Sequence, residues 1–141
     1  MVKYESDIKY IPYSQERVYA KLSDLTNLQG ISQHMDQIRE KTEGKLQDLT
    51  FDSDSMTITV QGMNVTLRII EREPSKCIKF EGENSPLPIN LWIQILPVTS
   101  EQAKLKVTIG AEVNMFMKAM VSKPLKQGVQ KVADMLSMIP Y

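Results

Sequence analysis

The chain has 141 residues and a mass of 16.1 kDa, a length typical of one compact domain, so we expect residues 1–141 to form a single domain. Its 17 basic and 17 acidic residues give a net charge of zero. Nucleic-acid-binding proteins need an excess of positive charge to neutralise phosphates, and we therefore expect no nucleic-acid partner. With 42% hydrophobic and 24% charged residues, the composition is that of a globular protein rather than of a disordered one.

Cysteine and histidine are too few for most metal and nucleophile chemistry. Cys77 and His34 are the single residues of their types, so no disulfide can form within the chain and no Cys/His cluster can hold zinc. We expect neither a metal nor another cofactor. The N-terminal sequence has no apolar signal core, and no run of about 18 apolar residues occurs. These features predict a cytoplasmic protein without an integral membrane segment.

The first predicted element is a strand over residues 3–10, where charged residues alternate with uncharged ones, so that Tyr4 and Tyr10 are predicted to share one face. Ser14 follows as a typical N-cap residue for a helix over 15–23. Asp24 is a typical cap for a second short turn of helix. The next segment, 31–44, has sparse apolar residues and is predicted to be a marginal helix or a surface loop.

Six further strands follow, each separated from the next by a turn-prone stretch. Because parallel neighbours would need long crossover connections, the short links predict an antiparallel meander. The predicted strands are 45–51, 55–61, 64–73, 76–84, 89–98 and 103–113.

The last predicted element is a long amphipathic helix, in which apolar residues recur every three or four positions from Met117 to Ile139. Pro124 interrupts this pattern, because proline removes a backbone donor and clashes with the preceding turn. Either the helix kinks there, or a new helix begins with Ser122 as its N-cap. Gly128 further weakens the middle of the helix.

This order of elements predicts an α+β fold, because one amphipathic helix must bury its apolar stripe against one apolar face of a sheet. We expect a curved antiparallel sheet of about seven strands wrapped around the C-terminal helix, with two short helices after the first strand. A curved sheet and a straight helix do not fill space completely. We therefore expect a cavity between them.

Four stretches of the chain carry a resemblance to a known family. The stretches are IPYSQERVYAKLSDLTNL (11–28), REPSKCIKFE (72–81), LWIQILPVTSEQAKLKVTI (91–109) and KPLKQGVQKVADML (123–136). They resemble the START-related helix-grip superfamily, also called SRPBCC or polyketide cyclase/dehydrase-like, and especially small bacterial members of the kind found in Bacteroides-type bacteria. The similarity extends over nearly the whole chain.

The resemblance implies a seven-stranded antiparallel sheet that grips the C-terminal helix, with a deep hydrophobic cavity between the two. Members of the superfamily bind lipids, sterols, polyketides or plant hormones, and a minority catalyse cyclisation, dehydration or hydrolysis. The superfamily has no universal catalytic motif, so the resemblance implies no catalytic residue.

The last two predicted strands can pair in two registers. A four-residue turn over 99–102 places Trp92 opposite Ile109 and points both Trp92 and Gln94 toward the helix. A slip of one residue would instead turn inward Leu91, Ile93 and Ile95. Both faces are apolar, and the sequence does not decide between the registers.

The first register and the helical stripe together define a candidate ligand site. Trp92 is either part of a cavity wall or an ordinary core residue. Gln94 is a polar amide among apolar neighbours and needs a partner, which is a ligand, a water, a backbone group or solvent. The candidate ligand-binding residues are Trp92, Gln94, Phe80, Ile109, Met117, Val121 and Leu125.

Methionine is concentrated near the last helix, where five of the nine lie. Flexible thioethers suit a pocket for varied apolar ligands, and they suit a packed core or an interface equally well. These five residues are Met115, Met117, Met120, Met135 and Met138.

Three hypotheses of function follow. The first is a noncatalytic protein that binds an apolar or amphipathic small molecule in the cavity. The second is a polyketide cyclase or dehydratase, which needs an ionisable group inside the same cavity. The third is an interaction module that forms a homodimer through an exposed strand face such as Leu91, Ile93 and Ile95.

His34 and Asp36 lie in the polar segment 31–44, which is a candidate lid over the cavity. We expect both residues to be solvated rather than catalytic.

Overall fold

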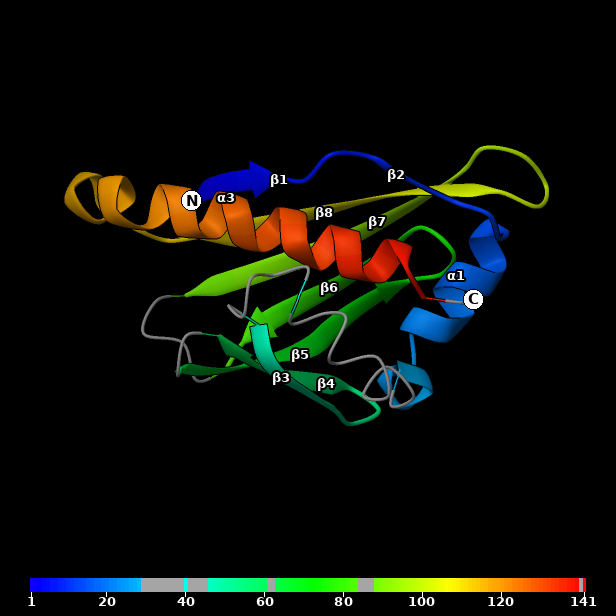
Figure 1. Ribbon diagram of the computed structural model, residues 1–141, viewed down its shortest axis with the longest axis horizontal. Helices are drawn as coiled ribbons and strands as arrows, with labels where there is room; N and C mark the ends of the chain where they lie inside the picture. The colour runs from blue at the N-terminus through cyan, green and yellow to red at the C-terminus, as the bar shows by residue number, and fades with distance from the viewer. Residues whose placement is uncertain (29–39, 41–45, 61–62, 84–87, 140) are drawn as a thin grey trace.

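The computed structural model describes residues 1–28, 40, 46–60, 63–83, 88–139 and 141. Figure 1 shows a curved sheet with one long helix lying across one of its faces. The strands are β1 (Val2–Glu5), β2 (Lys9–Ile11), β3 (Leu46–Phe51), β4 (Ser55–Val60), β5 (Met63–Glu73), β6 (Cys77–Gly82), β7 (Ile89–Pro97) and β8 (Ala103–Ala111). Helix α1 (Gln15–Leu22) follows β2, and helix α3 (Met115–Ser137) follows β8.

The sheet has eight strands in the order β1-β8-β7-β6-β5-β4-β3, with β2 also paired to β8, and every pair is antiparallel. Strands β3 to β8 form the predicted meander, and the N-terminal strands return to pair with the last one. The predicted α+β class, with a curved antiparallel sheet around a C-terminal helix, is therefore confirmed. In the described part of the chain, no helix is both long and apolar enough to span a lipid bilayer.

The sheet has one strand more than predicted because the N-terminal strand is divided at Ser6. The Ser6 N–H donates to the Val107 carbonyl at 2.8 Å, and the Val107 N–H donates to Ser6 Oγ at 3.0 Å. The side chain thus replaces one rung of the backbone ladder. Beyond this break the inward side changes, so Tyr4 is 8% exposed whereas Tyr10 is 71% exposed. The prediction that Tyr4 and Tyr10 share one face is wrong.

Helix α1 begins as its sequence predicts. The Arg17 N–H donates to Ser14 Oγ at 3.3 Å, and the helix buries Val18 and Leu22 completely. The following short turn is capped by Asp24, whose carboxylate accepts from the N–H and the hydroxyl of Thr26. These hydrogen bonds stabilise the charged carboxylate and lower the pKa of Asp24. The predicted helix and turn are confirmed.

Helix α3 passes through Pro124 without interruption. Its N-cap is Asn114, whose Oδ1 accepts from the Met117 N–H at 2.8 Å. Ser122 lies inside the helix, where its hydroxyl donates to the Lys118 carbonyl at 2.6 Å. The alternative in which a new helix begins with Ser122 as its N-cap is therefore wrong.

The middle of α3 contains two residues that weaken a helix. Pro124 has no N–H to donate to the preceding turn. A Cβ added at Gly128 would meet no other atom within 4 Å, so no close contact requires glycine there, and glycine costs a helix roughly 1 kcal/mol relative to alanine. The central segment of α3, between its N-terminal and C-terminal halves, therefore has a low intrinsic helix stability.

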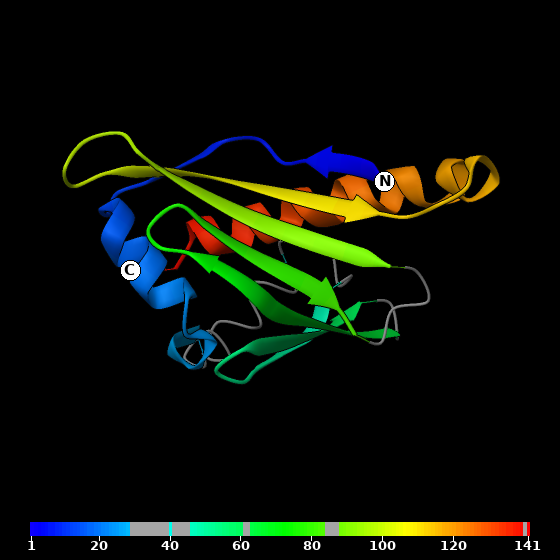
Figure 2. The same cartoon turned by 180° about the vertical axis from the view of Figure 1, so that it is seen from behind.

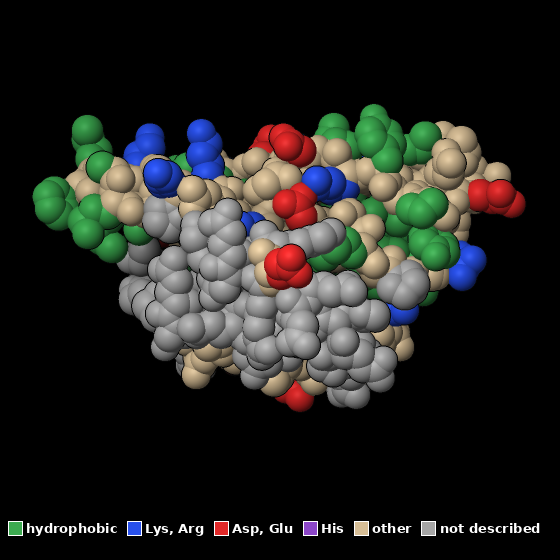
Figure 3. All heavy atoms as spheres, in the orientation of Figure 1, with side chains coloured by type: hydrophobic (Ala, Val, Ile, Leu, Met, Phe, Trp, Pro, Cys, Tyr) green, Lys and Arg blue, Asp and Glu red, His purple; other side chains and the backbone are tan. Residues whose placement is uncertain are grey.

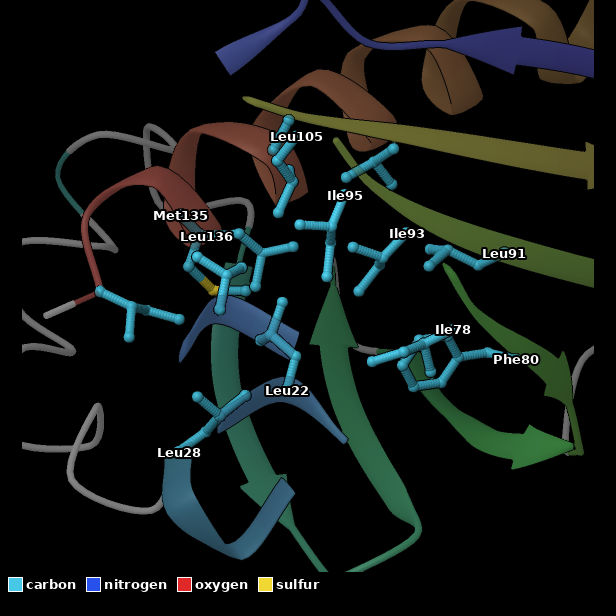
Figure 4. Packing of buried hydrophobic residues seen from close by; sticks show 14 of the residues in the cluster. Leu22, Leu28, Ile78, Phe80, Leu91, Ile93, Ile95, Leu105, Met135 and Leu136 are labelled. Carbon is cyan, nitrogen blue, oxygen red and sulfur yellow. The ribbon is translucent and has the colours of Figure 1, made fainter. Parts of the chain in front are cut away.

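The hydrophobic core lies between the inner face of the sheet, α1 and the C-terminal half of α3 (Figure 4). We call the face turned toward α3 the inner face. Figure 4 shows the side chains of β6, β7, β8, α1 and α3 converging there. The largest fully buried side chains are Phe80, Ile11, Leu22, Leu25, Ile78, Leu91, Ile93, Ile95, Leu105, Val18 and Val107.

The role of Ser6 can be tested by substitution. We expect Ser6→Ala to lower the free energy of unfolding by about 1–3 kcal/mol, because the buried Val107 N–H loses its acceptor. Urea unfolding measures this change. Ser100→Ala, at an exposed serine in the β7–β8 loop, is the matched control and should be neutral. Equal stability of the two variants would show that the Ser6 side chain does not replace a rung of the ladder.

Candidate ligand-binding site

Strands β7 and β8 pair in the second of the two registers. Leu91, and not Trp92, lies opposite Ile109. The strands remain paired up to Pro97, so the loop between them has the five residues 98–102 instead of four, and the extra residue shifts the register by one. The inward side chains of β7 are Leu91, Ile93 and Ile95, each at most 2% exposed. A dimer interface on these three residues, one of the hypotheses above, is excluded by their burial.

Trp92 and Gln94 lie on the outer face of the sheet, so their predicted inward orientation is wrong. The ammonium groups of Lys3 and Lys79 lie 5.0 and 5.4 Å from the centre of the Trp92 ring, in cation–π contact. A Cβ on Gly110 would lie 3.0 Å from the same ring, so glycine allows the indole to cover the neighbouring strand. Gln94 is exposed. We therefore leave both residues out of the candidate site.

The other five predicted residues divide between the inner face of the sheet and the apolar stripe of α3. Phe80 is fully buried in the core, and Ile109 is half-buried on the same inner face, with Leu91 of β7 between them. The α3 residues are spaced four apart, which places them on one face of the helix. All three are half-buried: Met117, Val121 and Leu125.

Burial along α3 changes from one half of the helix to the other. The C-terminal half is enclosed, and its buried residues are Val129, Ala133, Met135 and Leu136. In the N-terminal half, the residues of the same stripe remain partly accessible to solvent. Ile109 and Leu125 pack against the core cluster while keeping part of their surface exposed. The apolar layer between sheet and helix is thus fully buried at one end of α3 and only partly buried at the other, which we call the open end.

One polar pair joins the sheet to the open end of α3. The Tyr4 hydroxyl lies 2.6 Å from Ser122 Oγ. Because the Ser122 proton is donated to the Lys118 carbonyl, Tyr4 donates to Ser122. The Tyr4 oxygen then retains its own lone pairs as acceptors. Tyr4 pairs with Ile109 across the ladder, so this hydroxyl lies beside the half-buried apolar residues.

Sequence reasoning missed this pair. Tyr4 and Ser122 are 118 residues apart, and no local pattern connects them. An N-cap serine would accept from an N–H of its own helix, so this interpretation of Ser122 predicts no partner on the sheet. The only available signal is a serine within an apolar helical stripe, which requires a nearby polar partner.

The other reactive groups among the described residues do not form a second site. Burial, with a smaller contribution from Glu73 and Glu71, raises the pKa of the half-buried Cys77 thiol, so the thiol stays protonated and weakly nucleophilic at neutral pH. Within the described residues, no cluster of three His, Cys, Asp or Glu side chains could hold a metal ion. His34 and Asp36 lie outside the described residues.

The orientation of Trp92 can be tested by its fluorescence, because Trp92 is the single tryptophan. We expect acrylamide to quench its emission as it quenches a partly exposed indole. The protein unfolded in urea provides the fully accessible reference. Emission that acrylamide cannot reach would place Trp92 in the core and would contradict the observed register.

Comparison with solved structures finds the same architecture in proteins of low sequence identity. A truncated norcoclaurine synthase from Thalictrum flavum superposes with a TM-score of 0.66 at 13% identity, covering 96% of this chain and 92% of that one. A START superfamily protein from Mycobacterium smegmatis gives 0.57 at 10% identity, covering 95% and 96%. An uncharacterised protein from Bacillus thuringiensis gives 0.58 at 10% identity, covering 96% of each chain.

No family model matches the sequence, and no curated protein does so. The predicted link to Bacteroides-type bacteria stays a prediction. At these identities the superpositions bear on the fold, and they agree with the strand order and the position of α3 described above. The chain has the START-like helix-grip fold of the SRPBCC proteins.

Proposed function

We propose that the protein binds an apolar or amphipathic small molecule, lipid-like or polyketide-like, between the inner face of the sheet and the N-terminal half of α3. The observation that carries this proposal is the half-burial of the inward stripe at one end of the helix. Met117, Val121 and Leu125 are each partly buried, yet they keep contact with solvent, and Leu125 packs against the core. An apolar ligand would complete the burial that the polypeptide leaves unfinished.

The chemistry of the site favours a ligand that is mostly apolar. Burial of apolar surface contributes about 25 cal/mol per Å², so affinity would come from contact with Ile109 and the α3 stripe. The Tyr4 oxygen offers an acceptor at the same place. A ligand hydroxyl or amide that donates to this oxygen would fix the orientation of the molecule.

Proteins with this fold hold small organic molecules. One structure of norcoclaurine synthase from Thalictrum flavum is a complex with dopamine and hydroxybenzaldehyde. It superposes with a TM-score of 0.67 at 14% identity, covering 96% of this chain and 85% of that one. This supports the use of the helix-grip fold as a scaffold for binding small molecules.

Catalysis is a second candidate function, and the Tyr4 hydroxyl is the observation that favours it. A cyclase or dehydratase needs an ionisable group within hydrogen-bond reach of its substrate, and Tyr4 lies beside the open end of the apolar layer. We rank binding first because the hydrogen bond recorded for the Tyr4 hydroxyl in the described part of the chain is to Ser122, a hydroxyl, and not to a carboxylate or imidazole that could act as a partner in proton transfer.

A bulky substitution tests the site directly. We expect Leu125→Trp to weaken the binding of 1-anilinonaphthalene-8-sulfonate at least roughly tenfold, because the indole would fill the open end of the apolar layer. Titration by fluorescence measures the affinity. Lys126→Trp adds the same ring at the neighbouring, exposed position, and it should bind the probe as the unmodified protein does.

Unchanged affinity of Leu125→Trp in a protein that still unfolds cooperatively would exclude this site. Independently of this titration, native mass spectrometry and organic extraction of freshly purified protein would identify a copurified ligand by its mass. Recovery of a chemically altered molecule, after the extract is incubated with fresh protein, would favour the enzyme over the binding protein.

A further inference from the structure

The first turns of α3 carry large apolar side chains that point into solvent. Met115 is 91% exposed, Phe116 is 79% exposed and Met120 is 66% exposed. We call these three residues the α3 tip. In both views of the ribbon this end of α3 extends beyond the ends of the strands (Figures 1 and 2). Figure 3 shows hydrophobic side chains gathered on the same end of the molecule. Packing within the chain does not account for them.

Positive charge lies next to the α3 tip. Lys118, Lys123 and Lys126 are exposed, and the sequence contains no acidic residue over 113–133. Among the residues that the structure describes, no ion pair involves these three lysines. Figure 3 shows Lys and Arg side chains along the helix beside the hydrophobic group. The chain as a whole is neutral, so this is a local concentration of positive charge.

We propose that the α3 tip docks on the surface of an anionic phospholipid bilayer. Met115, Phe116 and Met120 would enter the boundary between headgroups and acyl chains, as the apolar face of an interfacial helix does. The three lysines would lie at headgroup level, where each is attracted to anionic lipid and can extend its ammonium group toward the phosphates. The attachment is peripheral, because only one end of the helix takes part.

A second copy of the chain fits this surface less well. A stable dimer buries about 800 Å² on each partner and uses some 20–30 residues of each, whereas the α3 tip is a small projecting end of one helix. A twofold dimer would also place the surface against itself. Lysines from the two copies would then approach one another, and α3 offers them no acidic residue before Asp134, so that like charges repel. An anionic bilayer provides the complementary charge.

The position of the tip relates docking to the proposed ligand site. Met117 and Val121 belong to the half-buried stripe, and they alternate along the helix with the exposed Phe116 and Met120. A docked tip would therefore bring the open end of the apolar layer close to the lipid. Docking itself does not depend on a bound ligand, so the two proposals can fail separately.

Vesicle co-sedimentation tests the docking. We expect the full chain to sediment with vesicles of phosphatidylcholine and phosphatidylserine, and to remain in solution with phosphatidylcholine alone. Phe116→Ser combined with Met120→Ser should weaken binding at least roughly tenfold by removing the inserted side chains. Tyr10→Ser, at an apolar residue that is 71% exposed on another part of the surface, is the control and should bind normally.

The charge requirement is tested separately. Replacement of Lys118, Lys123 and Lys126 by glutamine should weaken binding at least roughly tenfold, since each lysine near an anionic surface contributes about 1 kcal/mol, or a factor of five. Lys76→Gln, at an exposed lysine remote in sequence, should have little effect. Two results would overturn the proposal. One is equal binding to vesicles with and without phosphatidylserine. The other is the absence of vesicle binding together with a dimer that dissociates when either set of residues is replaced. Leu125→Trp should still dock, which distinguishes this result from failure of the ligand site.

Discussion

The packing of the C-terminal half of α3 against the inner face of the sheet is the interaction on which the rest of the structure depends. Helix α3, together with the short α1, has to cover one face of a sheet whose strand order runs seven strands across. Helix α3 packs mainly against β8, β1 and β2, and its C-terminal half encloses Val129 and Ala133 completely. Because this contact fixes one end of the helix, the other end projects past the strands (Figure 2), and the apolar stripe there is left half-buried.

The sequence of α3 agrees with this division. Pro124 and Gly128 lie between the buried and the exposed halves, where both weaken the helix, and no close contact requires glycine at position 128. Helices gain most of their stability from tertiary packing, so the N-terminal half is held mainly by its half-buried stripe and by the Tyr4–Ser122 hydrogen bond. A ligand that fills the open end would add contacts to this half of α3. Ligand binding would therefore stabilise the part of the helix that the protein's own packing holds least.

Local signals were sufficient to predict the strands and their order. Each strand of the meander begins and ends within two residues of its predicted bounds, because turn residues and alternation are properties of neighbouring positions. The site was predicted only in part. The register that turns Trp92 and Gln94 inward cannot be excluded from the sequence, because a loop of five residues cannot be told from one of four when both faces of a strand are apolar. The Tyr4–Ser122 pair and the exposure of Phe116 depend on how distant segments meet, which helical periodicity does not encode.

Hydrogen exchange of α3, followed by mass spectrometry, tests the central claim most directly. Exchange reports the free energy of local opening. The account predicts that amides in residues 115–123 exchange roughly tenfold or more faster than those in 129–137, and that an apolar ligand slows exchange in the first segment far more than in the second. Uniformly slow exchange along the whole helix, unchanged by any apolar ligand, would mean that the layer between sheet and helix is already closed, and would contradict the account.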